Sequence, residues 1–282
     1  MAGCSCKEAE SGKLGTLSIP FQTHGGKGGC QRRAGWEILH WRAADGVFYG
    51  SGRKHSRLSM SAPVAETLTP DAARMQIAQR TELLRGAGRR IAIGLAGGPG
   101  VGKSTLSAEL VATLNEDEPG VAALVPMDGF HMRQAKLESL GTAKDKGAPH
   151  TFEGAAFVAF LARLKAAQEA VSGPGYSRKI EDVVEDAFTV LPQTQVLVVE
   201  GNYLLLPDAP WDGVRPLLDL AVFIDVPRER VRARLLRRHA AEGLFTEERN
   251  REHVERVDLA NYDLVSTSRS RADLIITLDT DT

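Results

Sequence analysis

The chain has 282 residues, of which 43% are hydrophobic, and its formal net charge at pH 7 is -1. This length allows one large α/β domain with an appendage, and the balanced charge gives no reason to expect nucleic acid or anionic lipid as a partner. No apolar run approaches the roughly 18 residues of a membrane span, which predicts no membrane contact. All three cysteines, Cys4, Cys6 and Cys30, lie in the first part of the chain, a pattern that fits a reducing, cytoplasmic compartment.

The first 59 residues differ in composition from the rest of the chain. Up to Arg57 they hold nine Lys or Arg against four acids, with scattered glycine and serine and no lasting helical or strand period. We interpret residues 1–59 as a disordered or poorly packed extension, and residues 60–282 as the folded domain.

Other interpretations of this extension have weaker support. A transit peptide would be poor in acids, which fits only in part, and a secretory signal needs an apolar segment that is missing. Cys4-x-Cys6 with Cys30 and His24 could hold a metal, but C-x-C lacks the usual spacing of zinc ligands. Translation could also start at Met60, because the residues that follow it resemble an ordinary N-terminus.

Thr69-Pro70-Asp71 predicts the start of a helix, with a hydroxyl at the N-cap and proline at the first helical position. We expect this helix to run to about Arg85 and to stop at Gly86.

The most specific motif lies between residues 91 and 105, where the sequence reads IAIGLAGGPGVGKST. It matches the phosphate-binding pattern G-x-x-x-x-G-K-[ST], with an apolar strand before it and apolar residues at helical spacing after it. Backbone N–H groups at a helix N-terminus attract phosphate. In this motif, Lys103 would reach the β- and γ-phosphates, and the Ser104 hydroxyl would bind Mg²⁺. The alternative, a glycine-rich turn with an incidental lysine, does not explain strand, loop and helix together. The predicted ATP contacts are Gly97, Gly98, Pro99, Gly100, Val101, Gly102, Lys103, Ser104 and Thr105.

A second buried strand is predicted from Val121 to Met127, and Asp128 follows it directly. Ligands collect at the carboxyl ends of parallel strands, so Asp128 is a candidate catalytic and substrate-binding residue. The alternative is an aspartate that caps the following turn. His131 is a candidate substrate contact, although a lone histidine more often only satisfies hydrogen bonds.

Residues 136–150 predict a loop or short helix, and an amphipathic helix follows over roughly 153–170. Residues 176–190 suit an exposed strand pair or an insertion on the substrate side. Tyr176 and Arg178 are candidate acceptor contacts there. Arg178 and Lys179 could hold an anionic or polyhydroxyl acceptor, or could belong to a solvated face.

Val196 to Val199 reads as a buried parallel strand with Glu200 at its carboxyl end. Glu200 is the Walker-B candidate, which would act on Mg²⁺ directly or through water and would contribute to the substrate site. Further strands are predicted at 219–225 and 272–278.

Pro227 starts a helix with six arginines, and another helix begins near Thr246. Solvated faces usually explain such charge runs, but a closing lid needs guanidinium groups to neutralise the transferring phosphoryl group. We expect one or two of Arg234, Arg237 and Arg238 to act so, and assign Arg234 and Arg238 as catalytic candidates.

From about residue 89 to 278 the chain resembles the P-loop kinase group that contains uridine kinase, pantothenate kinase and phosphoribulokinase. It is most similar to the bacterial nucleoside/nucleotide kinase-like branch, also called fructose transport system kinase-like. The resemblance rests on GGPGVGKST at 97–105, PMDGFHM at 126–132, KGAPHTFE at 146–153, LVVEGNYLLL at 197–206, VFIDVP at 222–227 and the arginine-rich helix.

This resemblance implies an α/β, three-layer P-loop NTPase fold with a five-stranded parallel sheet and an arginine-bearing helical lid. It also implies ATP with Mg²⁺, and transfer of the γ-phosphoryl group to a hydroxyl of a small molecule, with Asp128 as the base and acceptor contacts near Tyr176. His150 and Glu181 depart from the pattern, which weakens any transfer of acceptor identity.

The predicted function is therefore an ATP-dependent kinase acting on a nucleoside, pantothenate or sugar-type acceptor. An ATP-binding regulatory protein without robust turnover is the alternative, against which Asp128 and Glu200 argue. A GTP-dependent switch would need an Asn-Lys-x-Asp element, and the chain has none. The sequence does not indicate the oligomeric state.

Overall fold

The computed structural model describes residues 63–86, 89–242 and 246–279, and the backbone of three strands before them. The chain divides into two compact units, Met1–Met60 and Ser61–Thr282. In the first unit, β1 (Gly15–Ser18), β2 (Ile38–Ala44) and β3 (Val47–Gly50) form an antiparallel sheet in that order. The rest of the extension, including the cysteines and His24, lies outside the described residues, so our interpretation of residues 1–59 stays a prediction.

The second unit is built on a parallel sheet with the strand order β4-β11-β10-β5-β9-β6. We expected five strands; the sixth, β4, is an edge strand whose VAETL sequence is largely exposed and pairs with β11 on one side only. Such a short, half-polar segment gives no strand signal until a neighbour is known. The strands are β4 (Val64–Leu68), β5 (Ile91–Ala96), β6 (Ala122–Pro126), β9 (Val196–Gly201), β10 (Leu220–Asp225) and β11 (Leu274–Leu278).

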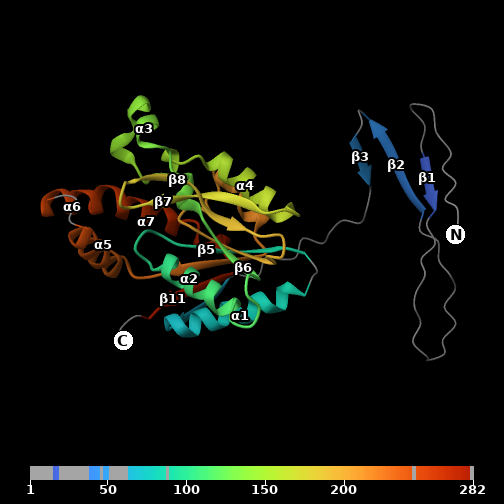
Figure 1. Ribbon diagram of the computed structural model, residues 1–282, viewed down its shortest axis with the longest axis horizontal. Helices are drawn as coiled ribbons and strands as arrows, with labels where there is room; N and C mark the ends of the chain where they lie inside the picture. The colour runs from blue at the N-terminus through green and yellow to red at the C-terminus, as the bar shows by residue number, and fades with distance from the viewer. Residues whose placement is uncertain are drawn as a thin grey trace. The chain divides into compact units, whose positions relative to one another are not determined.

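Helices cover both faces of this sheet, which confirms the three-layer α/β fold (Figure 1). The first helix begins after Thr69, whose side chain accepts a hydrogen bond from the Ala72 N–H at 3.3 Å, and it ends at Arg85 as expected. The helix expected at 153–170 ends earlier, at Ala166, because β7 begins at Val171. The helices are α1 (Pro70–Arg85), α2 (Lys103–Leu114), α3 (Gln134–Leu140), α4 (Gly154–Ala166), α5 (Arg228–Glu242), α6 (Glu247–His253) and α7 (Leu259–Ser266), with a π-helical turn at Val254–Asp258 between the last two.

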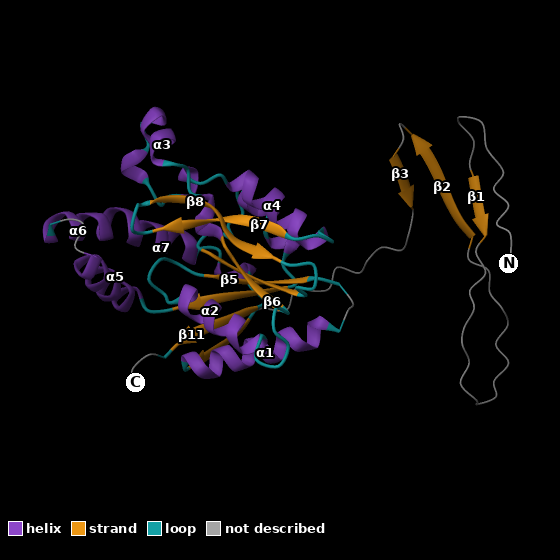
Figure 2. Cartoon of the chain, in the orientation of Figure 1, coloured by secondary structure: helices purple, strands orange, loops and turns teal. Residues whose placement is uncertain are grey.

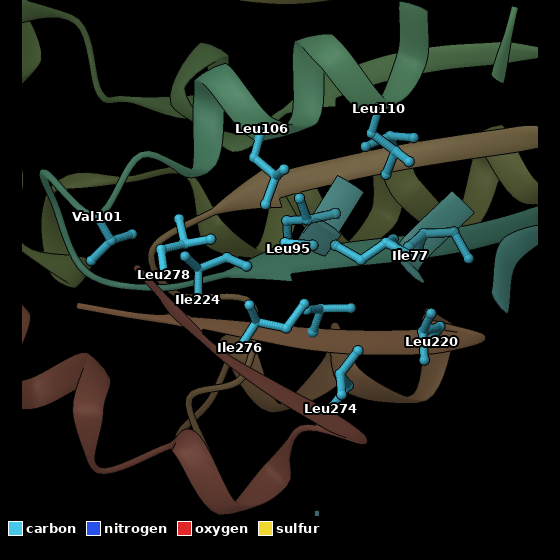
Figure 3. Close-up of a cluster of buried hydrophobic side chains, with 14 of the residues drawn as sticks. Ile77, Leu95, Val101, Leu106, Leu110, Leu220, Ile224, Leu274, Ile276 and Leu278 are labelled. Carbon is cyan, nitrogen blue, oxygen red and sulfur yellow. The ribbon is translucent and has the colours of Figure 1, made fainter. Parts of the chain in front are cut away.

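Alternate residues of the central strand β5 serve the two halves of the core. Ile91, Ile93 and Leu95 pack with α1 and α2 on one face, in the cluster shown in Figure 3. Ala92 and Ala96 point to the other face, toward the cluster that includes residues of α4 and α7. Because both faces are buried, the strand reads as a continuous apolar run.

A two-stranded antiparallel hairpin, β7 (Val171–Ser177) and β8 (Asp182–Val190), lies outside the main sheet (Figure 2). This confirms a strand pair in the segment read as an exposed insertion. The hairpin approaches the turn after β6 so closely that a Cβ on Gly129 would lie 2.0 Å from the Pro174 carbonyl oxygen. This contact sets Tyr176 beside His131.

Within the described residues, no helix combines the length and apolar character needed to cross a membrane.

Candidate active site

The loop between β5 and α2 has the backbone that its glycines predict. Gly100 and Gly102 have φ values of 76° and 97°, in the left-handed region where a Cβ is strained. Gly102 is the residue before the first turn of α2, so the loop leads directly into a helix N-terminus. That end of a helix presents unpaired N–H groups and a positive dipole to an anion.

Lys103 and Ser104 begin α2 and face the cavity above the loop. Lys103 is only 9% exposed, and its ammonium lies 3.5 Å from the Gly98 carbonyl oxygen, which accepts a hydrogen bond from it. The Ser104 hydroxyl donates a hydrogen bond to Glu200 Oε2 at 3.2 Å. A buried ammonium and a hydroxyl–carboxylate pair therefore meet at the start of the helix.

Glu200 lies at the end of β9, paired in register with Leu95 of β5 and Pro126 of β6. It is 5% exposed; burial raises the pKa of its carboxyl group, and the nearby Lys103 charge opposes that effect. Hydroxyl and carboxylate oxygens are the ligands that Mg²⁺ prefers, so Ser104 and Glu200 fit a magnesium site as their donor set stands.

Asp128 follows β6 on the same edge of the sheet, as expected. Its carboxylate is close enough to raise the pKa values of Glu200 and Tyr176 by charge. No hydrogen bond within the described residues ties that carboxylate to the following turn, so the capping alternative finds no support. The carboxylate lines the same cavity as Lys103.

His131 is held in one orientation by its neighbours. Its Nδ1 lies 2.7 Å from the Asp128 carbonyl oxygen, which can only accept, so Nδ1 carries a proton and Nε2 is the acceptor in the neutral ring. Its ring centroid lies 3.9 Å from that of Phe152 and 4.5 Å from that of Tyr176. Burial lowers the pKa of His131, which favours the neutral ring.

The Tyr176 side chain is held by a hydrogen bond to the turn of the hairpin. Its hydroxyl donates to Glu181 Oε2 at 3.2 Å, and burial followed by the Glu181 charge raises its pKa. The phenol therefore keeps its proton throughout the physiological range. Arg178, two residues further along the chain, also lines the cavity, whereas Lys179 does not.

A cavity of about 970 Å³ brings together most of the predicted residues. Pro99, Gly100 and the run from Gly102 to Thr105 line it, as do Asp128, His131, Tyr176 and Arg178. The predicted residues Gly97, Gly98, Val101 and Glu200 are not in its lining. Arg234 and Arg238 of α5 line it too, and Arg237 does not. The Arg234 guanidinium approaches two carbonyl oxygens of the loop, at 3.5 Å from Gly100 and 3.4 Å from Val101. The sequence therefore identified residues from four segments that line one cavity: the phosphate loop, the turn after β6, the hairpin and α5.

Several lining residues escaped the sequence analysis. Asn261 Nδ2 lies 3.1 Å from the Gly147 carbonyl oxygen, which also accepts from the buried Tyr203 hydroxyl. Of these, Asn202 could have been found, since it directly follows the Glu200-Gly201 pair. Its buried Oδ1 has no hydrogen-bond partner among the residues that the structure describes. The other missed lining residues include Lys144, Lys146, His239, His253, Asp258 and Asn261.

Three of the missed residues, His239, His253 and Asp258, form a cluster whose side chains are of the types that bind metal ions. His239 Nε2 lies 2.9 Å from Asp258 Oδ2, and donor atoms of His239, His253 and Asp258 all lie within 4.8 Å of one another. Arg256 and Arg238 also act on this cluster, where their charges help to lower the pKa of His253. Those two cations oppose a metal ion there, and the His239–Asp258 pair instead links α5 to the π-helical turn.

Comparison with known proteins identifies relatives over most of the second unit. Residues 92–281 match the sequence profile of the Phosphoribulokinase / Uridine kinase family. A Schizosaccharomyces pombe protein, provisionally named a uridine kinase, is 34% identical over 195 residues, 67% of this chain and 83% of that protein. A Streptomyces coelicolor pantothenate kinase is 36% identical over 140 residues, 49% of this chain and 42% of that enzyme.

Among solved structures, a protein from Silicibacter sp. TM1040, provisionally named a fructose transport system kinase, matches with a TM-score of 0.66 and 33% identity. The match covers 75% of this chain and 100% of that one.

Proposed function

The chain belongs to the Phosphoribulokinase / Uridine kinase family, and from that premise we propose that it is an ATP-dependent kinase that phosphorylates a hydroxyl of a small molecule. The acceptor would be of the nucleoside, pantothenate or sugar type. One observation carries the proposal: Lys103, Asp128 and the lid arginine Arg234 line one cavity of about 970 Å³, large enough for two small ligands side by side.

The nucleotide end of the cavity would hold ATP by its phosphates. The loop N–H groups and Lys103 bind the β- and γ-phosphates, and Arg234 neutralises charge on the transferring group from the opposite side. Ser104 and Glu200 would hold Mg²⁺, which would neutralise part of the negative charge of the nucleotide.

At the other end, Asp128 orients the acceptor hydroxyl and takes its proton. The acceptor oxygen forms a bond to the γ-phosphorus, the bond between that phosphorus and the bridging β-phosphate oxygen breaks, and ADP leaves with the electron pair. His131 Nε2 is an acceptor beside this carboxylate, so it can orient a second hydroxyl of the same molecule. Positioning and charge neutralisation therefore account for the reaction.

We also propose that the protein is cytoplasmic and acts without nucleic acid or membrane. The balanced net charge of -1 and the three clustered cysteines support this proposal.

A screen of candidate acceptors for ADP release tests the proposal against the alternative of an ATP-binding regulator. Uridine, pantothenate, fructose and their phosphorylated relatives are each incubated with ATP and Mg²⁺. A kinase releases ADP in step with a phosphorylated product, and Lys103→Met abolishes both. Binding of an ATP analogue, with no acceptor-dependent ADP from any compound, would favour the regulator.

A further inference from the structure

The cavity holds more cationic side chains than a nucleotide alone explains. Eight lysines and arginines line it, against four carboxylates. Lys103 and Arg234 adjoin the phosphate loop and serve the nucleotide end. Lys146 lies at the other end, where the acceptor hydroxyl would bind. Its surroundings therefore bear on the charge of the acceptor.

Lys146 has no ion-pair partner within the described residues. Its ammonium donates to the Glu181 backbone carbonyl at 2.6 Å and to Gln134 Oε1 at 3.4 Å, both uncharged acceptors. An ammonium has three donors, so one remains for a ligand. A half-buried charge without a counter-ion is costly, and an anionic ligand would remove that cost.

The position of Lys146 connects it to the chemical centre. It lies 5.6 Å from the centroid of the Tyr176 ring, which in turn contacts His131. Its charge reaches His131, whose pKa it helps to lower. The backbone carbonyl oxygen of Asp128 lies against His131 Nδ1. Tyr176 and His131 therefore connect Lys146 to Asp128.

Glu181, whose backbone carbonyl accepts from Lys146, has a carboxylate that is already engaged. Glu181 Oε2 accepts the Tyr176 hydroxyl at 3.2 Å, and the structure records no pairing between that carboxylate and Lys146. In the hairpin turn, the Glu181 carboxylate therefore accepts from the Tyr176 hydroxyl, and only the Glu181 backbone carbonyl accepts from the Lys146 ammonium.

The aromatic side chains at this end already pack against one another. Phe152 is 4% exposed, and the ring of His131 packs against both Phe152 and Tyr176. The parts of the Phe152 and Tyr176 rings that contact His131 are therefore not open to a stacked nucleobase.

We propose that the acceptor is a small hydroxylated anion, a hydroxy acid or a sugar phosphate, and not a nucleoside. Lys146 binds its carboxylate or phosphate group by a charge-assisted hydrogen bond, while the hydroxyl to be phosphorylated faces Asp128. This inference rests on the proposed kinase function and narrows its substrate class.

Matched acceptor pairs test the inference directly. ADP release is measured with D-glycerate and glycerol, pantothenate and pantothenol, and fructose 6-phosphate and fructose, with uridine as the nucleoside. We expect kcat/KM for at least one anionic compound to exceed that of its neutral partner by about tenfold or more, the effect of one charged contact. The first two pairs report a carboxylate site and the third a phosphate site.

A variant pair assigns the effect to the lysine. Lys146→Gln should raise KM for the preferred anion by about tenfold or more, with KM for ATP unchanged and a melting temperature equal to or above that of the wild type. Lys179→Gln removes a nearby exposed charge outside the cavity and should change neither KM. Unchanged discrimination in Lys146→Gln, or failure of every anionic compound to react, would overturn the inference.

The outcomes separate this inference from the kinase proposal. Turnover of uridine alone would overturn the anionic acceptor and leave the kinase intact. Absence of ADP release with every compound, despite binding of an ATP analogue, would contradict both.

Discussion

The Ser104 hydroxyl donates to Glu200 Oε2 at 3.2 Å, which joins the start of α2 to the end of the neighbouring strand. These residues are 96 positions apart in the chain, and the parallel pairing of β5 with β9 brings them together. The pair places a hydroxyl and a carboxylate beside the buried Lys103 ammonium. The arrangement explains why the site lies at this edge of the sheet.

Replacing Glu200 should raise the stability of the protein and lower its activity. Burial raises the pKa of this carboxyl group in the folded protein, so its ionised form costs stability at pH values above that raised pKa. Glu200→Gln removes the charge, and we expect a higher melting temperature at pH 7.5, by roughly 2–4 °C per kcal/mol released. Turnover should fall about 100-fold or more, because the proposed Mg²⁺ ligand is lost. A lower melting temperature would contradict this account.

The acid side of the stability profile should report on His131. Its pKa is lowered by burial from an ordinary value of 6.5. Below pH 6.5 the unfolded chain binds a proton that the folded ring resists, so stability falls as pH drops toward the lowered pKa. His131→Asn retains a donor for the Asp128 carbonyl and cannot titrate. When the pH is lowered from 7.5 to 5.5, the melting temperature of the wild type should decrease more than that of this variant. Equal decreases in melting temperature would contradict a buried, neutral His131.

Two arginines of α5 provide a matched comparison for the lid. Arg234 approaches the Gly100 and Val101 carbonyl oxygens, whereas Arg237 lies outside the cavity lining. We expect Arg234→Ala to lower kcat about 100-fold or more, the size typical of one group that stabilises transition-state charge. Arg237→Ala should keep kcat within about twofold. Similar steady-state kinetics for the two variants would refute the distinction.

The close approach of the hairpin predicts a packing requirement at Gly129. A Cβ there would lie 2.0 Å from the Pro174 carbonyl oxygen, so Gly129→Ala must displace the backbone. Overpacking of this kind costs about 1–3 kcal/mol or more. Gly86 is the matched control: among the described residues nothing lies within 4 Å of a Cβ there, and its φ is -63°. Gly86→Ala should therefore be neutral or slightly stabilising. Urea denaturation measures both; an unchanged Gly129→Ala would show that the hairpin can move away.

The sequence predicted those parts of the fold whose signals are local. The loop from Gly97 to Thr105 fixes strand, turn and helix by itself, and the helix at 70–85 is marked by its cap and its proline. β4 escaped because an exposed edge strand has no alternating pattern. The early end of α4 at Ala166 depends on the hairpin that follows, which a helical period does not reveal.

Site residues divide in the same way. Asp128 and Glu200 were found because an acid after a buried strand faces the ligand edge of a parallel sheet. Lys146 was not, because it lies on a loop whose course depends on tertiary contacts. His253 and Asp258 were not, because the end of α6 and the π-helical turn after it carry no sequence signal that points to a ligand edge. Lys179 and Arg178 are adjacent in sequence, and only the structure shows which of them lines the cavity.

Phosphoryl transfer by Asp128→Asn, measured together with its affinity for a non-hydrolysable ATP analogue, tests the central claim most directly. The variant keeps the shape of the side chain and removes the base, so acceptor-dependent ADP release should fall by about 10²–10⁴-fold. Affinity for the analogue should stay within about twofold, since Lys103 and the loop are untouched. Turnover equal to that of the wild type would contradict the role of Asp128 and the arrangement of the site built around it.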